Sequence, residues 1–119
     1  MKAFTDLEQS KRLAEILPLE SADMYYDVDS YGVRTTPEVL ITSVVRKKDI
    51  PCWSLTALLD VLQKTAYFID EDANVMLDSY KTVEWDLGIN NSDLELVTES
   101  NPIDACYEMI IKLSELKIL

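Results

Sequence analysis

With 119 residues, of which 48% are hydrophobic and 28% charged, the chain has the size of one domain and can bury a core without disulfide bonds. Its 22 acidic and 11 basic residues give a formal net charge of −11, which disfavours binding to nucleic-acid phosphates and to anionic membranes. No apolar run approaches the roughly 20 residues that a membrane-spanning helix needs, and no secretory signal precedes the first predicted helix. We therefore expect one cytoplasmic domain over residues 1–119, in which the thiols of Cys52 and Cys106 are reduced.

The N-terminal part of the chain carries the signals of a helix followed by strands. Thr5 and Glu8 have the spacing of a capping box, in which each side chain accepts a hydrogen bond from the backbone amide of the other. Pro18 disfavours helical geometry in the residue before it, so the helix is expected to end there. The predicted elements are a helix over 5–16, a short strand over 23–28, a loop over 27–37 and a β-branched strand over 39–45.

A second helix is predicted to begin after Ser54, which is a favoured N-cap residue. Trp53 and Leu58 have the spacing of a hydrophobic staple, which fixes the direction of the chain as it enters a helix. The apolar stripe with helical spacing consists of Leu55, Leu58, Leu59 and Leu62.

Four consecutive strands are expected between this helix and the last one, over residues 66–69, 75–80, 83–89 and 94–98. In the third of them Val83, Trp85 and Leu87 alternate with Glu84 and Asp86. This alternation is the pattern of a strand with one buried face. The turns between the runs are short, which favours antiparallel pairing.

The last helix is predicted to begin at Asn101 and Pro102, a favoured N-cap followed by a residue favoured at the first helical position. Each predicted helix has one apolar face, so the helices are expected to cover the same face of the sheet. The predicted fold class is α+β, with an antiparallel sheet of about four to five strands packed by about three helices on one face.

Most of the residue patterns that mark enzymes and cofactor sites are missing from the sequence. The chain has no histidine, which removes the commonest general base and excludes catalytic sets of the Ser-His-Asp and Cys-His types within one chain. Its two glycines form no phosphate-binding loop. The acidic turn over residues 70–74 offers oxygen ligands for a cation, but its spacing is not that of an EF-hand, and a solvated turn is favoured. We therefore predict no catalytic residue, no metal site and no cofactor.

Acidic residues are concentrated in one segment of the chain. Residues 65–104 contain ten acidic residues and one basic residue, Lys81, and so account for −9 of the net charge of −11. If Leu94 and Leu96 face the core, the acidic residues that alternate with them face outward. The side chains predicted to form an acidic face on the open side of the sheet are Asp78, Glu84, Asp86, Glu95 and Glu99.

This acidic face is the predicted binding surface. We interpret the chain as a noncatalytic interaction or accessory protein, a monomer or homodimer, that docks a basic protein through this face. A nucleic-acid-binding protein fits as the partner, with the carboxylates in place of phosphates. The alternatives are a solubilising surface, a small carboxylate-based hydrolase and a structural dimerising subunit. A pocket with two acids of raised pKa would favour the hydrolase, and a free sheet edge or exposed apolar residues on the last helix would favour the subunit.

Four segments of the sequence resemble a known group of proteins. The segments are Phe4–Lys11, Glu20–Met24, Pro51–Leu59 and Asn101–Ile110. Together they resemble small proteins of unknown function that are carried by prophages and other mobile elements of gut anaerobic bacteria. Members of this group have a proline near the position of Gln63, and the difference concerns the end of the second helix. The resemblance implies a mobile-element setting and brings no activity, cofactor or catalytic residue with it.

Overall fold

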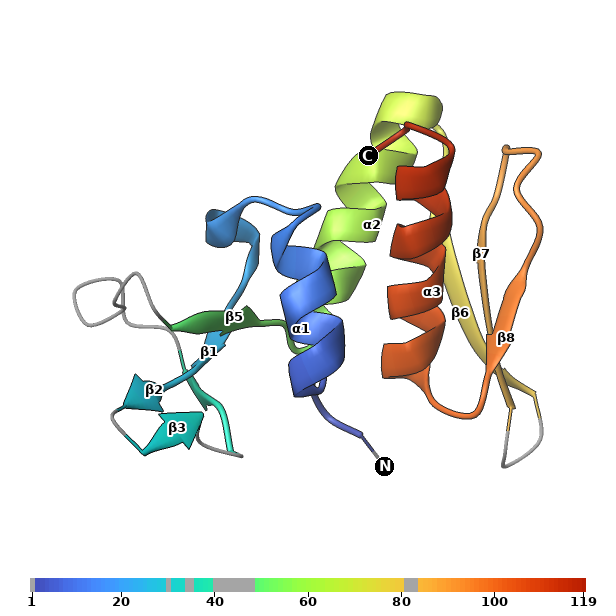
Figure 1. The fold of residues 1–119 in the computed structure, drawn as a ribbon. Helices are drawn as coiled ribbons and strands as arrows, with labels where there is room; N and C mark the ends of the chain where they lie inside the picture. Colours follow the sequence, from blue (N-terminus) through green and yellow to red (C-terminus); the bar gives the residue numbers. More distant parts are fainter. Residues whose placement is uncertain (1, 30, 34–35, 40–48, 81–83) are drawn as a thin grey trace.

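The computed structural model describes residues 2–29, 31–33, 36–39, 49–80 and 84–119 of the chain. These residues form three layers, in which three α-helices lie between two antiparallel sheets of three strands each (Figure 1). The fold is therefore α+β, as predicted, but its strands are divided between two three-stranded sheets and a two-stranded ribbon instead of forming one sheet. No helix within the described ranges is both long and apolar enough to cross a membrane.

Helix α1, Leu7–Ala14, has its capping box one residue later than predicted. Its N-cap is Asp6, whose carboxylate accepts a hydrogen bond of 2.8 Å from the amide of Gln9, and the Gln9 side chain accepts one of 3.1 Å from the amide of Asp6. The capping box predicted from Thr5 and Glu8 is therefore wrong. Thr5 is fully buried instead, and its hydroxyl accepts a hydrogen bond from a backbone amide in the segment before α2.

Helix α2, Leu55–Ile69, confirms the predicted N-cap and extends further than predicted. The hydroxyl of Ser54 accepts a hydrogen bond of 3.3 Å from the amide of Ala57. The strand predicted over 66–69 is wrong, because these residues form the last turn of α2. Ala66 continues the buried stripe of the helix and is fully buried in the core, so tertiary packing outweighs the strand-like sequence.

The first sheet joins three short strands from separate parts of the N-terminal half. Its order is β4-β1-β5, and both strand pairs are antiparallel. The strands are β1 Met24–Tyr26, β4 Glu38–Val39 and β5 Ile50–Cys52, and a 3-10 turn, η1 Leu19–Ser21, precedes them. The predicted strand over 39–45 overlaps β4 at Val39, and its remainder lies outside the described residues. β5 was not predicted from the sequence. It contains Pro51, a residue that strands tolerate mainly at the edge of a sheet, and β5 is an edge strand among the described strands of this sheet.

The predicted loop over 27–37 contains a short antiparallel ribbon. Its strands are β2 Val28–Asp29 and β3 Gly32–Val33. Gly32 has a φ of +114°, a backbone conformation that residues with a Cβ atom rarely adopt, so this turn favours glycine.

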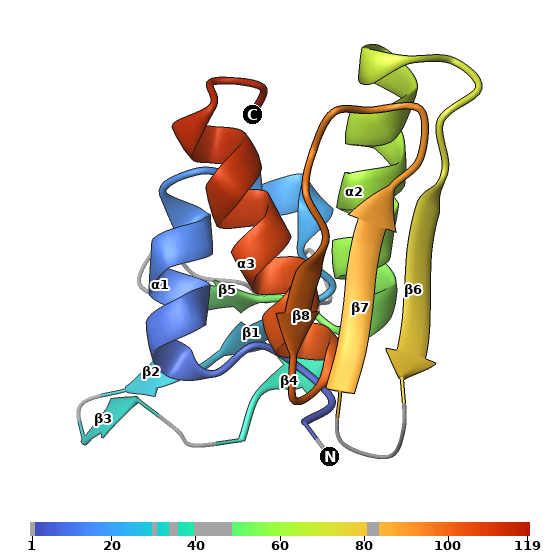
Figure 2. The same ribbon diagram turned by 90° about the vertical axis from the view of Figure 1, so that its right-hand side faces the viewer.

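The second sheet, in the order β6-β7-β8, is antiparallel and lies on the other side of the helices from the first sheet (Figure 1). Its strands are β6 Val75–Tyr80, β7 Glu84–Ile89 and β8 Val97–Glu99. The strands predicted over 75–80 and 83–89 are confirmed over their described residues, whereas β8 begins later than the predicted range 94–98. Helices α2 and α3 pack against one face of this sheet, and Figure 2 looks onto the other face, in front of which no described element lies.

Helix α3, Pro102–Glu115, confirms the predicted start of the last helix. The Asn101 side chain accepts a hydrogen bond of 2.9 Å from the amide of Asp104. The core lies where α2, α3 and the second sheet meet, and the large, fully buried side chains in it include Leu58, Leu62, Leu87, Ile103, Met109, Ile110 and Leu113. This core covers the inner face of the second sheet. The strand register therefore shows which side chains of the sheet point toward the core and which point away from it.

Candidate functional site on the second sheet

The strand register divides the side chains of the second sheet between two faces. Leu77, Leu87 and Val97 lie opposite one another and pack into the core, so they mark the inner face. Successive side chains point to opposite faces, so the next row, which contains Asp78 and Asp86, lies on the outer face. We call this outer surface the open sheet face, and its described side chains are Met76, Asp78, Glu84, Asp86, Leu96 and Thr98.

Two carboxylates face each other across the middle of the open sheet face. Asp78 of β6 lies directly opposite Asp86 of β7, and side chains at such positions have Cβ atoms about 4.5–5.5 Å apart. Glu84 is exposed on the same face of β7. The hydroxyl of Thr98 donates a hydrogen bond of 2.6 Å to the Asp86 carboxylate and draws it toward β8. Like charges at directly opposed positions destabilise a sheet, so this arrangement costs stability.

The structure brings together part of the predicted acidic set on the open sheet face. The three residues that share this face are called the acidic centre, and they are Asp78, Glu84 and Asp86. Glu95 is exposed but lies in the connection between β7 and β8. Glu99 lies opposite Trp85, in a row of the inner face, and is half-buried. Residues 90–96 do not form a strand, so the alternation assumed over 94–98 does not continue into β8.

The other end of the open sheet face is apolar and is absent from the predicted site. Leu96 was expected to face the core, but it is 61% exposed, and its side chain lies over Gly88, where a Cβ atom would collide with it. Met76 lies opposite Gly88 in the neighbouring strand and is 45% exposed. A glycine inside a strand often marks such a close approach, so Gly88 is the sequence signal that points to this end. The open sheet face therefore combines an acidic centre with an apolar end.

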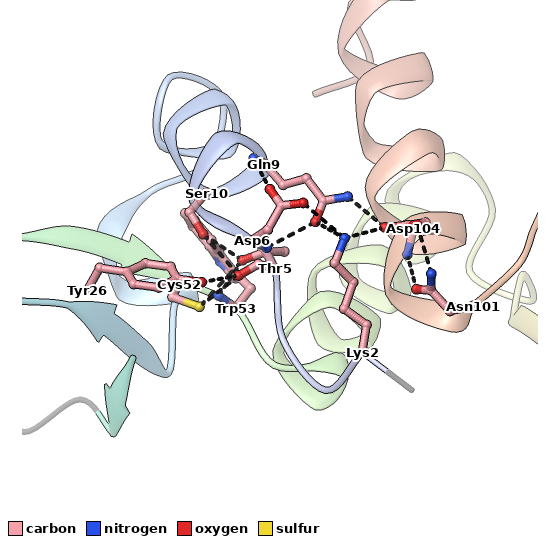
Figure 3. A network of polar contacts seen from close by, with 10 residues as sticks. All are labelled: Lys2, Thr5, Asp6, Gln9, Ser10, Tyr26, Cys52, Trp53, Asn101 and Asp104. Carbon is pink, nitrogen blue, oxygen red and sulfur yellow. Dashed lines mark hydrogen bonds and ion pairs between the residues drawn. The ribbon is translucent and has the colours of Figure 1, made fainter. Parts of the chain in front are cut away.

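A second group of polar side chains joins the N-terminal segment to α1 and α3 (Figure 3). The ammonium of Lys2 lies 2.8 Å from Oδ1 of Asp104, and the side-chain amide of Gln9 donates to the same oxygen at 2.8 Å. The side-chain amide of Asn101 donates to the other oxygen at 2.7 Å. Partial burial acts to raise the pKa of Asp104, but these donors outweigh it, so the pKa of Asp104 lies below its ordinary value of 3.8. The contact ties the start of the chain to the start of α3.

Changing Asp104 to asparagine is expected to lower the free energy of unfolding by about 1 kcal/mol at pH 7, because partly exposed charge-assisted hydrogen bonds are lost. A carboxyl group whose pKa falls on folding stabilises the native state above its ordinary pKa of 3.8, and this contribution is lost as the pH falls through the folded-state pKa. Urea denaturation at pH 7 and at about pH 3 should therefore show the difference from wild type shrinking in acid. Asp93→Asn, in an exposed loop, is the control. A difference that is the same at both pH values contradicts the role given to Asp104.

The buried part of the same region is structural. The amide of Thr5 donates to the carbonyl of Trp53 at 2.9 Å, and the amide of Trp53 donates to the Thr5 hydroxyl at 3.1 Å. The hydroxyl of Tyr26 donates to the Thr5 carbonyl at 2.8 Å, and the hydroxyl of Ser10 lies 2.8 Å from that of Thr5 (Figure 3). Burial raises the pKa of the neighbouring Cys52 thiol. This thiol is therefore protonated near neutral pH and is a poor nucleophile.

Two surface grooves lie away from the open sheet face. One has a volume of about 630 Å³, lies between the end of α2, the β7–β8 connection and the end of the chain, and includes Asp93 and Leu116 in its lining. The other has a volume of about 450 Å³, lies on α2, and is lined in part by Gln63 and by Asp60, which pairs with Lys64 at 2.9 Å. Neither groove contains the two carboxylates that the hydrolase alternative requires. Within the described ranges, no group of three His, Cys, Asp or Glu residues is placed to hold a metal ion.

Comparisons with models of protein families, with curated proteins and with solved structures find no match to this chain. The assignment of a function therefore depends on the geometry and the charge of the molecule. The feature that most needs an explanation is the opposed pair Asp78 and Asp86 on a sheet face that no described element covers.

Proposed function

We propose that the protein is a noncatalytic binding module that docks a basic protein surface on its open sheet face. The observation that carries this proposal is the pairing of Asp78 with Asp86 across two strands, with Glu84 exposed on the same face. The three strands contain no lysine or arginine, so no basic side chain within them neutralises these carboxylates. A basic partner would supply the counter-charges and relieve the repulsion between the strands.

The apolar end of the open sheet face supports the same proposal. Met76 and Leu96 are exposed on the surface that also holds the acidic centre. Protein interfaces combine apolar contacts that exclude water with polar groups around them. A partner that presents apolar side chains next to basic ones would therefore match both parts of the face.

The partner that fits best is a protein with an exposed basic surface. A nucleic-acid-binding protein is one example, because the carboxylates would occupy the positions of phosphates. In the mobile-element setting that the sequence resemblance implies, such a partner would be a host or phage factor, and this protein would be an accessory that modulates it. Attraction between exposed charges gives fast association that weakens with added salt.

Two of the alternatives are less well supported by the described residues. A solubilising surface accounts for exposed carboxylates, but not for their placement directly opposite one another. A homodimer through the open sheet face would bring together two copies of the acidic centre, in chains that each carry a formal net charge of −11.

A pull-down with two matched baits tests the proposal. The first bait neutralises the acidic centre with the substitutions Asp78→Asn, Glu84→Gln and Asp86→Asn. The second bait removes the same number of charges from exposed positions outside the open sheet face, with Glu71→Gln, Asp93→Asn and Glu95→Gln. Each bait and the wild type are mixed with cell lysate at low and at moderate salt, and the captured proteins are quantified by mass spectrometry.

We expect the wild type and the second bait to capture a basic protein that the first bait captures at least about tenfold more weakly. Moderate salt should weaken the capture, because it screens exposed charges. Equal capture by all three proteins, or capture that does not respond to salt, contradicts the proposed function.

A further inference from the structure

The edge of the second sheet that β6 forms has no neighbouring strand among the described residues. β6 and β7 are the longest of the described strands, and among these strands β6 pairs only with β7. Figure 2 shows β6 at the outer edge of the sheet, with α2 behind it. Natural proteins often protect a free edge with charged side chains, most often lysine, with proline or by keeping the edge strand short. β6 has six residues without lysine or proline, and its one charged side chain is Asp78.

Hydrogen bonds around β6 show which of its backbone groups point to the free edge. The amide of Asn90 donates to the carbonyl of Asn74 at 3.0 Å, so the backbone of Asn74 points toward β7. The amide of Val75 instead donates to the side chain of Gln63 at 3.2 Å, so it points away from β7. Backbone groups alternate in direction along an antiparallel strand, so the amide and the carbonyl of Leu77 also point to the free edge.

We propose that the basic partner binds as an additional strand along the free edge of β6. This inference rests on the proposed function and specifies the conformation of the partner. An extended segment beside β6 would exchange backbone hydrogen bonds with Leu77 and so continue the ladder of the sheet by one strand. A segment of about six residues would match the length of β6.

The side chains of β6 indicate which partner sequence would fit. On the outer face, the side chains of the added strand would lie beside Asp78, in the row that continues to Asp86, so basic residues are favoured there. On the inner face they would lie beside Leu77, which packs against the core, so apolar residues are favoured there. Successive side chains in a strand point to opposite faces, so the partner is an extended segment in which basic and apolar residues alternate.

The groove on α2 adjoins the edge of β6 at the N-terminal end of that strand. The side chain of Gln63 lines the groove and also bridges to the start of β6, since it donates to the carbonyl of Ala73 and accepts from the amide of Val75, both at 3.2 Å. Tyr67 and Phe68 line the same groove and are 61% and 86% exposed. Exposed aromatic side chains are frequent at protein interfaces, so the groove is placed to receive an apolar side chain from the end of the added strand.

Neither the other edge of the sheet nor a second copy of this chain offers the same match. β8, at the other edge, has three residues and gives an added strand little to pair with. A second copy would bring another Asp78 to the edge, and its β6 has no basic residue to set against the carboxylates. Charge complementarity therefore favours a foreign basic strand.

Fluorescence anisotropy at low salt tests the inference with a labelled peptide of about seven residues in which lysine and valine alternate. Two modified peptides carry a methyl group on the backbone nitrogen of every valine or of every lysine, and the charge is the same in all three. In an antiparallel added strand whose lysines lie on the outer face, the valine amides point to β6 and the lysine amides point away. Methylation of the valines should weaken binding by at least about tenfold, and methylation of the lysines by less than about threefold.

The outcomes separate this inference from the proposed function. If both modified peptides bind as well as the parent, and the variant Asp78→Asn with Asp86→Asn does not bind, strand addition is overturned and docking on the open sheet face stands. Failure of the parent peptide to bind the wild type would overturn both. Loss of binding on methylation of the lysines alone would support an added strand in the parallel direction. Sedimentation equilibrium completes the test, since a dimer that the peptide does not dissociate would place a second copy on β6.

Discussion

Replacing Asp78 by lysine is expected to stabilise the protein and to weaken its binding to a basic partner. The substitution turns the like-charge pair with Asp86 into a pair of opposite charges, so the free energy of unfolding should rise by about 0.5–1 kcal/mol at low salt. The same change places a positive charge in the acidic centre, so the affinity for the lysine–valine peptide should fall by more than about tenfold. Added salt screens exposed charges, so both effects should become smaller.

Urea denaturation measures the effect of Asp78→Lys on stability, and fluorescence anisotropy measures its effect on binding. The matched control is Glu71→Lys, which makes the same charge change in an exposed turn after α2. This control should change the free energy of unfolding by less than about 0.5 kcal/mol and the affinity by less than about threefold. A gain in stability without a loss of binding would show that the carboxylates serve solubility alone. A loss of stability would show that Asp78 supports the fold.

Replacing Trp53 by alanine is expected to lower the free energy of unfolding by about 3–5 kcal/mol. Trp53 is fully buried, and its indole N–H donates a hydrogen bond of 3.0 Å to the hydroxyl of Ser21. Its backbone exchanges two hydrogen bonds with Thr5, in the segment before α1. Alanine would leave a cavity where η1, the N-terminal segment and the start of α2 meet. This loss is a large part of the free energy of unfolding of a typical domain, which is about 5–15 kcal/mol.

The matched control for this prediction is Trp85→Ala. Trp85 is half-buried in β7, so its truncation should cost about 1–2 kcal/mol. Urea denaturation followed by circular dichroism compares the two variants, and the tryptophan that remains in each reports on the tertiary structure by fluorescence. If Trp53→Ala costs no more than Trp85→Ala, the central position of Trp53 in the core is contradicted.

The starts of the helices are largely predictable because their chemistry is local. Ser54 and Asn101 act as N-caps as predicted, since each side chain needs only a nearby backbone amide of the same helix. Thr5 has the right spacing for the same role but does not perform it. The tertiary structure buries Thr5 against the segment before α2, and Asp6 caps the helix instead.

The last turn of α2 shows how packing overrides a strand-like sequence. Tyr67, Phe68 and Ile69 are residue types that favour strands. Ala66 is buried in the core and Ile69 packs against it, so the helical stripe of α2 continues through this turn. Contacts with distant elements stabilise the helical conformation of residues 66–69, and the sequence of these four residues does not reveal such contacts.

The candidate site is divided in the same way between local and long-range causes. Alternation within β6 and β7 was sufficient to place the acidic centre on one face, because the direction of a side chain in a strand depends only on its position along that strand. The alternation did not place Glu95 and Glu99 on this face, because residues 90–96 form no strand and the pairing resumes only in β8.

The amino-acid sequence by itself determined the net charge, two of the helix caps and the alternation in β6 and β7, because each depends only on composition or on residues a few positions apart. The tertiary structure alone decided that the described strands form separate sheets, that no described strand lies beside the outer edge of β6 and that Leu96 lies over Gly88. These features arise from pairings between distant segments, such as that of Tyr25 with Pro51. The stability of such pairings does not follow from any local sequence pattern. The carboxylates could therefore be found in the sequence, whereas the surface that they share with apolar residues and with the edge of β6 exists only in the folded chain.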